Sequence, residues 1–305
     1  MKYSIEMASK LSGLTPILIR AWENRYNILK PERTEGNHRL YSEEDITRLC
    51  LLSEVRNFGF RISDIVNLTD SELRTLIVKK TDFDEEHSQE HISNSSHNTL
   101  VVDLLNLVEK YDEQSIKTLI SELRINYSKP MIINNIILPL MREVGAKWKS
   151  GEMRISHEHF ISAIISNYLT NMRENNKKYQ LSRKVVVCTL SGQYHEIGAL
   201  AASVLISEGG YKVIYLGANS PTEEIAASFL KSGADAIVIS IIIPEIDSFL
   251  LTEFQRLREY INKAPILVGG NLNDSFGEKL NLLGVNYITD INAIVPQLEK
   301  AFLKT

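Results

Sequence analysis

The spacing of apolar residues divides this chain of 305 residues into segments of different kinds. Up to about Val78 the sequence is dense in helix signals and has no long apolar run typical of a strand. Residues 79–98 are polar and rich in Ser, Asn, Glu and His, which predicts a linker. Apolar residues recur at helical spacing over 99–180, whereas over 181–305 short apolar runs alternate with helical segments. The pattern predicts a multidomain protein with α and α/β parts.

Four amphipathic stretches with short connections fill residues 99–180, namely LVVDLLNLVEKY, SIKTLISELRINY, MIINNIILPLMREVGAKW and HEHFISAIISNYLTNMRE. Helices joined in this way are expected to pack as a four-helix bundle. In residues 181–305 the runs VVVCTL, VIYLG, AIVISIII and PILVGG are rich in β-branched residues, and a weaker last strand covers 285–289. Their alternation with amphipathic segments predicts a parallel sheet with helices on both faces, a flavodoxin-like (Rossmann-like) domain.

The composition is ordinary for a soluble globular protein, with 44% hydrophobic and 24% charged residues. No run of 18 apolar residues occurs, and the first residues open no signal-peptide core, so we expect neither a membrane nor a secreted protein. Cys50 and Cys188 lie far apart and neither belongs to a Cys-x-x-Cys pair. We therefore expect neither a disulfide framework nor a zinc site, and we expect a cytoplasmic location.

The first segment carries the signals of a DNA-reading unit. Residues 1–61 hold ten Lys or Arg against eight Asp or Glu, although the whole chain has a net charge of −4. Ser4 can cap a first helix, and Thr15, followed by Pro16, can cap a second. Two short helices joined by a turn that contains Gly13 form the helix-turn-helix pattern.

The second predicted helix interleaves two arginines with Trp22 and Tyr26. Taken alone, these aromatic residues are equally consistent with a core position and the arginines with a solvated face. However, the ordered segments IRAWENRY, PER, HRLYSEEDI and LLSEVRNFGFRISDI resemble the DNA-binding domain of MerR-type regulators. The resemblance implies a winged helix-turn-helix over residues 1–78, with a recognition helix in the major groove and a wing on phosphates. The DNA contacts that it implies are Thr15, Arg20, Arg25, Tyr26, Arg33, Arg39 and Tyr41.

A histidine follows the first predicted strand of the α/β part. The segment QYHEIG places His195 directly after VVVCTL and at the start of a helix. Ligands of open α/β sheets bind at the carboxyl ends of strands, and imidazole is a good ligand for a transition metal. A lone histidine is more often structural, but Ser240 follows the third strand and Gly269-Gly270 follows the fourth. Small residues at successive strand ends leave room for a ligand to approach the backbone.

His-x-x-Gly, then Ser, then Gly-Gly resembles the cobalamin-binding domain of methionine synthase and the cobalamin-dependent mutases. The resemblance implies that His195 replaces the cofactor's own benzimidazole beneath cobalt. It also implies a slot for the cofactor's tail, lined by Gly198, Ser240, Gly269 and Gly270. The family pattern opens with an Asp that accepts a hydrogen bond from the histidine, whereas this chain has Gln193. An amide oxygen can accept that bond but leaves the imidazole less basic, so we expect a weaker bond to cobalt.

A second constellation, Trp148 followed by Glu158-His159, lies in GAKWKSGEMRISHEHF. Spacing alone leaves open that these residues are a helix end and a chance charged pair. The stretch resembles the helical cap of CarH-type cobalamin-dependent photoreceptor repressors, and this resemblance covers nearly the whole chain except the linker. It implies that Trp148, Glu158 and His159 flank the adenosyl face of the cofactor. In that family a histidine after the tryptophan caps cobalt once the adenosyl group has left. Here that residue is Lys149, and because lysine is protonated at neutral pH, no stable adduct with two histidines is expected after illumination.

These resemblances imply a transcriptional regulator, not an enzyme. They imply a repressor that binds adenosylcobalamin, assembles as a homo-oligomer (dimer or tetramer) on a double-stranded DNA operator, and releases the DNA when light cleaves the cobalt–carbon bond. Three alternatives stay open: a regulator that senses cobalamin without light, a cobalamin enzyme or methyl carrier, and a module that has lost the cofactor and binds proteins. Gln193 keeps the last alternative open, while the DNA-reading segment and the lack of a separate substrate barrel argue against the enzyme.

Overall fold

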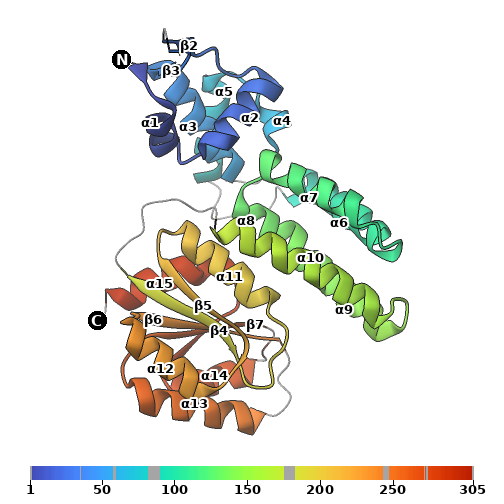
Figure 1. The fold of residues 1–305 in the computed structure, drawn as a ribbon, viewed down its shortest axis with the longest axis vertical. Helices are drawn as coiled ribbons and strands as arrows, with labels where there is room; N and C mark the ends of the chain where they lie inside the picture. Colours follow the sequence, from blue (N-terminus) through green and yellow to red (C-terminus); the bar gives the residue numbers. More distant parts are fainter. Residues whose placement is uncertain are drawn as a thin grey trace. The chain divides into compact units, whose positions relative to one another are not determined.

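The computed structural model describes residues 2–34, 36–57, 60–81, 90–174, 183–242, 247–270, 272 and 274–303. The chain forms two compact units, residues 1–144 and 145–305. The division between them falls inside the helix α9 (Leu138–Ser150) and not in the linker that the sequence predicts. Each unit is therefore described by itself (Figure 1).

The first unit begins with a small winged helix-turn-helix. Its elements are β1 (Lys2–Tyr3), α1 (Ile5–Ser12), α2 (Pro16–Tyr26), β2 (Glu32–Arg33), β3 (Arg39–Ser42), α3 (Glu43–Asn57), α4 (Ile62–Ile65) and α5 (Asp70–Thr81). The caps are those that the sequence predicts, because Ser4 Oγ accepts the N–H of Met7 and Thr15 Oγ1 accepts the N–H of Leu18. Gly13, at φ +71°, makes the turn between the two helices.

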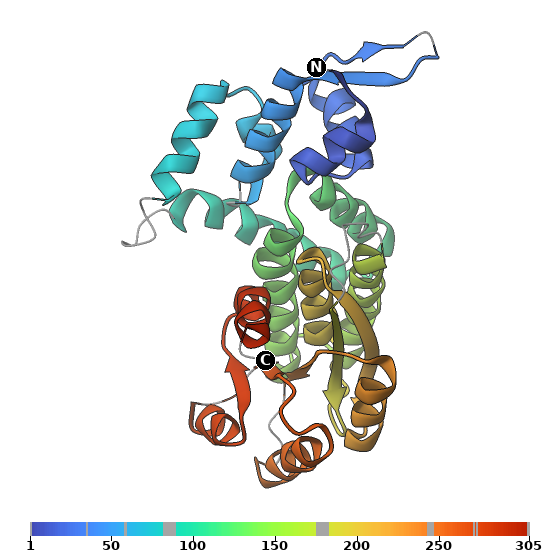
Figure 2. The same ribbon diagram turned by 90° about the vertical axis from the view of Figure 1, so that its left-hand side faces the viewer.

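The three short strands pair antiparallel in the order β1-β3-β2, and Figure 2 shows the β2–β3 hairpin extending away from the helices of the same domain. Behind it lies an apolar core built from α1 to α5. Its largest fully buried side chains include Trp22, Tyr41, Ile19, Leu49 and Leu52. The hairpin is thus a wing fixed at its base by Tyr41.

The helices of the predicted bundle follow. They are α6 (Glu90–Glu109), α7 (Glu113–Asn126), α8 (Lys129–Ile132), the π-helical turn η1 (Ile133–Ile137), α9, and, in the second unit, α10 (Ile155–Glu174). The third predicted helix is therefore a continuous helix from Lys129 to Ser150 that contains one π-helical turn. Helix α6 begins inside the predicted linker, because a helix started by apolar residues propagates into the polar residues that precede them. The rest of that linker, residues 82–89, lies outside the described residues.

The second unit contains a five-stranded parallel sheet in the order β5-β4-β6-β7-β8. Its elements are β4 (Lys184–Leu190), α11 (Ile197–Glu208), β5 (Lys212–Ser220), α12 (Thr222–Ser232), β6 (Ala236–Ile241), α13 (Asp247–Ile261), β7 (Ile266–Gly270), α14 (Asp274–Leu282), β8 (Val285–Ile288), η2 (Ile291–Ala293) and α15 (Ile294–Phe302). The first strand, β4, lies between β5 and β6, so the strand order reverses there. Such a switch point is where open α/β sheets bind ligands.

Both faces of the sheet are covered, as the alternating pattern predicts. On β4 the side chains of Val185 and Val187 pack with α11 and α15, while Val186 and Cys188 pack with α12, α13 and α14. Figure 1 shows α11 and α15 on one side of the strands and α12 to α14 on the other. Because both faces are buried, the strands read as nearly continuous apolar runs.

Among the described residues, no helix has the length and apolar character needed to span a membrane.

Candidate functional site

The carboxyl edge of the sheet brings together the strand-end residues that the sequence singles out. His195 lies between the end of β4 and the start of α11. Ser240 on β6 pairs in register with Gly269 on β7, and Ile241 pairs with Gly270. Since β4, β6 and β7 are neighbours in the sheet, the three sets lie on adjacent strands at one edge, beside the switch point.

The imidazole of His195 is exposed, and within the part of the chain that the structure describes it takes part in no hydrogen bond or ion pair. Both ring nitrogens are therefore available to an external group. A surface histidine without a protein partner at a ligand-binding edge differs from a structural histidine, whose nitrogens are hydrogen-bonded. This geometry suits an axial metal ligand supplied from the loop after β4.

Gln193 does not hold that imidazole. Its side chain is buried, and its Oε1 accepts the backbone N–H of Ile242, just past β6, at 3.2 Å. Its own carbonyl accepts the hydroxyl of Thr189 at 2.5 Å and the N–H of Asn219 at 3.1 Å. Gln193 thus joins the loop after β4 to the end of β5 and to the residue after β6, and the expected bond from His195 to its amide oxygen is not formed in this structure.

The two glycines after β7 differ in their surroundings. A Cβ atom on Gly269 would have the carbonyl oxygen of Ile288 as its nearest neighbour, at an ordinary 3.8 Å. A Cβ on Gly270 would lie only 1.7 Å from the carbonyl oxygen of Ile241, and its φ is +140°. Gly270 is therefore required by the backbone itself, whereas a Cβ atom on Gly269 would make only an ordinary van der Waals contact.

Gly198, at the start of α11, faces Ser240. A Cβ on Gly198 would lie 2.5 Å from Ser240 Oγ, so no carbon atom fits between the two residues in this structure. Ser240 is buried, with 8% of its surface exposed. The helix and the strand end are in direct contact here because both residues are small.

Glu196 and Tyr215, which the sequence analysis did not select, lie beside His195. The Tyr215 hydroxyl donates to Glu196 Oε2 at 2.9 Å, and burial, followed by the neighbouring carboxylate, raises the pKa of Tyr215 well above its usual range. The guanidinium of Arg173, near the end of α10, stacks over the Tyr215 ring at 4.9 Å. These contacts link α10 to the start of α11. The position of Glu196, next to the histidine in QYHEIG, was the one sequence signal for it.

The second constellation lies at the turn between α9 and α10. Trp148 is 41% exposed. The Nδ1 of His159 lies 2.6 Å from Glu158 Oε2, and the other oxygen of that carboxylate accepts the hydroxyl of Ser162 at 2.7 Å. No hydrogen bond or ion pair between described residues joins this constellation to His195. Both constellations lie in the unit of residues 145–305.

Two further side chains near Trp148 bear on cobalt chemistry. Lys149 is exposed on the last turn of α9. The Nδ1 of His157 accepts the backbone N–H of Arg154 at 3.0 Å, and this bond fixes its ring at the start of α10. Neither side chain is therefore placed as a ready replacement for a histidine directly after Trp148.

Six of the seven predicted DNA-reading residues divide into two groups, and the seventh, Tyr26, is half-buried with its hydroxyl bonded to Asn126. Arg20, Arg25 and Arg33 are exposed, and Arg33 Nη1 donates to Asn37 Oδ1 across the tip of the wing at 2.7 Å. Thr15 is exposed as well, although its hydroxyl caps α2. Their contacts with DNA stay a prediction.

Arg39 and Tyr41 instead point inward to Glu23 on α2. Arg39 Nε lies 2.9 Å from both carboxylate oxygens, and the Tyr41 hydroxyl donates to Oε2 at 3.3 Å. Burial and the neighbouring carboxylate raise the pKa of Tyr41 to about 12. A phosphate contact by Tyr41 does not fit a side chain with no exposed surface, and Arg39 would have to share its charge with Glu23.

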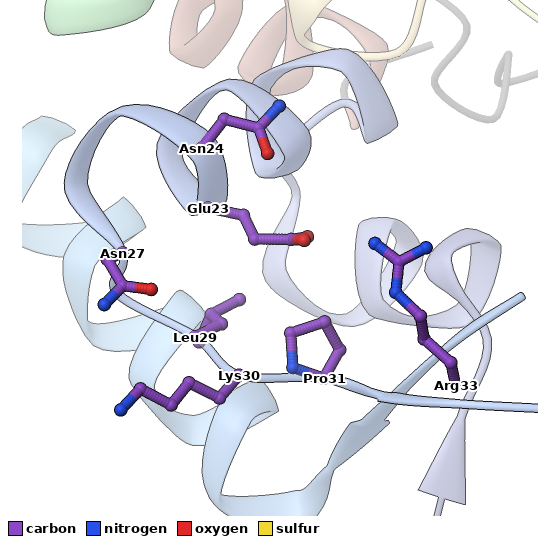
Figure 3. A pocket seen from close by; sticks show the side chains of 7 residues that line it. All are labelled: Glu23, Asn24, Asn27, Leu29, Lys30, Pro31 and Arg33. Atoms are coloured by element: carbon purple, nitrogen blue, oxygen red, sulfur yellow. The ribbon is translucent and has the colours of Figure 1, made fainter. Parts of the chain in front are cut away.

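Beside this pair lies an open hollow of about 430 Å³ between the end of α2 and the wing (Figure 3). Polar side chains predominate in its walls, among them two amides and two cations. The lining residues are Glu23, Asn24, Asn27, Leu29, Lys30, Pro31 and Arg33.

Comparison with known families identifies three segments of the chain. Residues 3–72 match the family described as MerR HTH family regulatory protein, and residues 100–171 and 183–289 each match a family described as B12 binding domain. The chain joins a MerR-type helix-turn-helix domain to a two-part B12-binding module.

Relatives of this MerR–B12 chain include regulators of similar length. The HTH-type transcriptional repressor CarH of Myxococcus xanthus is 25% identical over 269 residues, which cover 88% of either chain. The repressor CarA of the same organism is 20% identical over 272 residues, covering 88% of this chain and 87% of that one. A solved structure, the monomethylamine corrinoid protein of Methanosarcina barkeri, aligns with a TM-score of 0.54 at 16% identity and covers 67% of this chain and 98% of its own. The similarity to this solved structure shows the fold of the helical bundle and the parallel sheet, and only the fold.

Proposed function

We propose that this MerR–B12 chain is a transcriptional repressor that binds adenosylcobalamin, holds a double-stranded DNA operator as a homo-oligomer, and releases it on illumination. The observation that carries the proposal is the exposed imidazole of His195 at the switch point of the sheet, which has no hydrogen-bond or ion-pair partner among the described residues. The same chain carries a winged helix-turn-helix on which Arg20, Arg25 and Arg33 are exposed.

One face of α2 is suited to read DNA. Ile17, Arg20 and Asn24 are all exposed and, at spacings of three and four residues, share one side of the helix. We call these three residues the reading face. An arginine can bind guanine, an amide can bind adenine, and an apolar side chain can contact the thymine methyl group. The sequence analysis missed Ile17 and Asn24, which only the burial pattern of α2 identifies.

The wing and the number of copies complete the DNA-binding proposal. Arg33 on β2 is exposed and suited to a phosphate. A single unit of this size buries too little surface for tight binding, so the functional species is a dimer or tetramer.

The residues at the carboxyl edge fit the lower side of a corrinoid. His195 would hold cobalt through one ring nitrogen, and the absence of a side chain at Gly269 would leave room for the cofactor's tail. Trp148, with the Glu158–His159 pair, would cover the opposite side. When bound, adenosylcobalamin would supply a cobalt–carbon bond that light can break. Glu196, which follows His195 in the chain, is held by the Tyr215 hydroxyl at the start of α11.

A light-independent cobalamin sensor is the second candidate. The observation in its favour is that Lys149 occupies the position after Trp148 and that the ring of His157 already serves as a helix cap. An illuminated chain then has no imidazole directly after Trp148, and the imidazole of His159 is paired with Glu158, so the response to light would be weak.

The test is an absorption spectrum of purified protein after incubation with adenosylcobalamin in the dark, desalting and illumination. We expect a coloured protein whose spectrum changes on illumination, and a His195→Ala variant that loses the histidine-bound signature. Protein that leaves the column colourless would refute the cofactor. A spectrum that shifts with no change in DNA affinity would leave the light-independent sensor.

DNA binding is tested separately with duplexes selected by the full-length protein from a randomised pool. Arg33→Ala should weaken binding to every duplex and lower the slope of affinity against salt by about one unit. Asn24→Ala should instead change which duplexes are preferred. If neither variant differs from wild type, the reading face and the wing are misplaced.

A further inference from the structure

The recognition helix α2 has a second face, opposite the reading face, that contacts the end of α7. The indole Nε1 of Trp22 donates to the backbone carbonyl of Ile125 at 2.8 Å. One turn further along, the hydroxyl of Tyr26 donates to Asn126 Oδ1, also at 2.8 Å. The helix that would read DNA is therefore hydrogen-bonded on its far side to a helix of the segment that matches a B12 binding domain.

Two arginines of the DNA-reading domain reach the same place. Arg56 on α3 lies over the Trp22 ring at 5.5 Å and donates through Nη2 to the carbonyl of Arg124 at 3.2 Å. Arg61 lies over the ring of Tyr127 at 5.5 Å, and its Nε donates to the Tyr127 hydroxyl. We call residues 124–127 the α7 clamp.

The chemistry of a helix end explains why the contact forms there. The last four carbonyls of a helix have no partner within the helix, and the end carries a partial negative charge. Arg124 and Ile125 are in the last turn of α7, and their carbonyls accept from Arg56 and Trp22. Ile125 also packs against the apolar core of the DNA-reading domain. That domain thus supplies the partners that the end of α7 requires.

We propose that the α7 clamp positions the recognition helix, so that operator affinity depends on the state of the cobalamin cap; the inference rests on the proposed function. Tyr26 is then a positioning residue whose hydroxyl binds Asn126, although the MerR resemblance assigns it to DNA. Because α7 packs against α6, a displacement of the bundle helices moves the α7 clamp. The clamp in turn displaces α2 without contacting the reading face.

The test is a double-mutant cycle in the full-length chain, with the selected duplex as probe. Tyr26→Phe and Asn126→Ala each remove one side of the same hydrogen bond, so each should weaken binding by roughly two- to tenfold. The double variant should be no weaker than the worse single variant. The salt slope should stay unchanged because no phosphate contact is lost. Ser121→Ala, on an exposed turn of α7, is the control and should bind like wild type.

Two readouts separate positioning from a structural role. Asn126→Asp keeps an oxygen acceptor and should restore most of the affinity. The ratio of operator affinities with and without adenosylcobalamin should fall toward one in Asn126→Ala and stay at the wild-type value in Asn126→Asp.

The outcomes distinguish the two proposals. A wild-type chain that selects no duplex would remove the proposed function. Normal wild-type binding with a loss in Tyr26→Phe but none in Asn126→Ala would show that the tyrosine contacts DNA and would overturn the clamp. Additive losses, or a cofactor ratio unchanged in Asn126→Ala, would overturn it as well.

Discussion

Replacing Gly270 by alanine should disrupt the sheet edge that holds the candidate cobalamin site. The added carbon would lie 1.7 Å from the carbonyl oxygen of Ile241, whereas real Cβ atoms essentially never approach closer than 3.0 Å. The end of β7 must therefore move by more than about 1.3 Å. The φ of +140° adds strain of about 1–3 kcal/mol for a non-glycine residue. Losing the pairing of Ile241 with Gly270 costs a further hydrogen bond or two, about 0.5–1.5 kcal/mol each. We expect a loss of roughly 3–5 kcal/mol in the free energy of unfolding of the α/β domain.

Gly269→Ala is the matched control, since its Cβ meets nothing closer than 3.8 Å. It should change stability by less than about 1 kcal/mol, yet lower the retention of adenosylcobalamin if the space above β7 receives the tail. Stability is measured by amide hydrogen exchange of the β4–β7 peptides in increasing denaturant, because a multidomain chain does not unfold in one step. Equal stability of the two variants would refute the reasoning about Gly270.

Other predictions concern titration and cobalt ligation. Burial raises the pKa of the Cys188 thiol to about 12, so only Cys50 should react with a thiol reagent in the native chain at pH 8; two reactive thiols would contradict this. The pKa of Tyr41 is raised from 10.0 to about 12, so the folded chain keeps that proton longer than the unfolded chain. The free energy of unfolding should therefore fall by roughly 2–3 kcal/mol between pH 10 and 12. In the Tyr41→Phe variant, the free energy of unfolding measured over the same pH range should fall less. His195→Ala should keep part of the adenosylcobalamin on a desalting column but lose the imidazole-bound spectrum. Lys149→His should give illuminated protein a spectrum of cobalt held by two histidines, which wild type lacks; the same spectrum in wild type would refute the inference from Lys149.

The architecture was predictable because it follows from local patterns. The five β-branched runs became β4 to β8, since buried parallel strands leave nearly continuous apolar runs. The caps at Ser4 and Thr15 were predictable because capping joins residues three apart. The start of α6 at Glu90 was not predictable, because its polar residues form a helix through the apolar turns that follow them.

The candidate site was predictable only in part. The order of the strands brings the ends of β4, β6 and β7 together, and the sequence motifs identify which residues stand there. Their partners could not be read from spacing. Gln193 binds Ile242, Glu196 binds Tyr215, and Tyr26 binds Asn126, which lies in another domain. Each contact joins elements that meet only after the helices have packed, so the position of a residue in a sequence motif does not reveal its hydrogen-bond partner.

The contacts of α2 explain how one displacement can alter base and phosphate contacts together. The helix is held on one side by the α7 clamp through Trp22 and Tyr26, and on another by the wing through Glu23 and its paired Arg39. The Glu23–Arg39 pair is largely shielded, with 11% and 23% of the two side chains exposed, so breaking it costs more than breaking a surface ion pair. A shift of the α7 clamp that turns α2 therefore carries the wing along with it. If the reading face and Arg33 contact DNA as proposed, such a shift would change specificity and affinity in the same step.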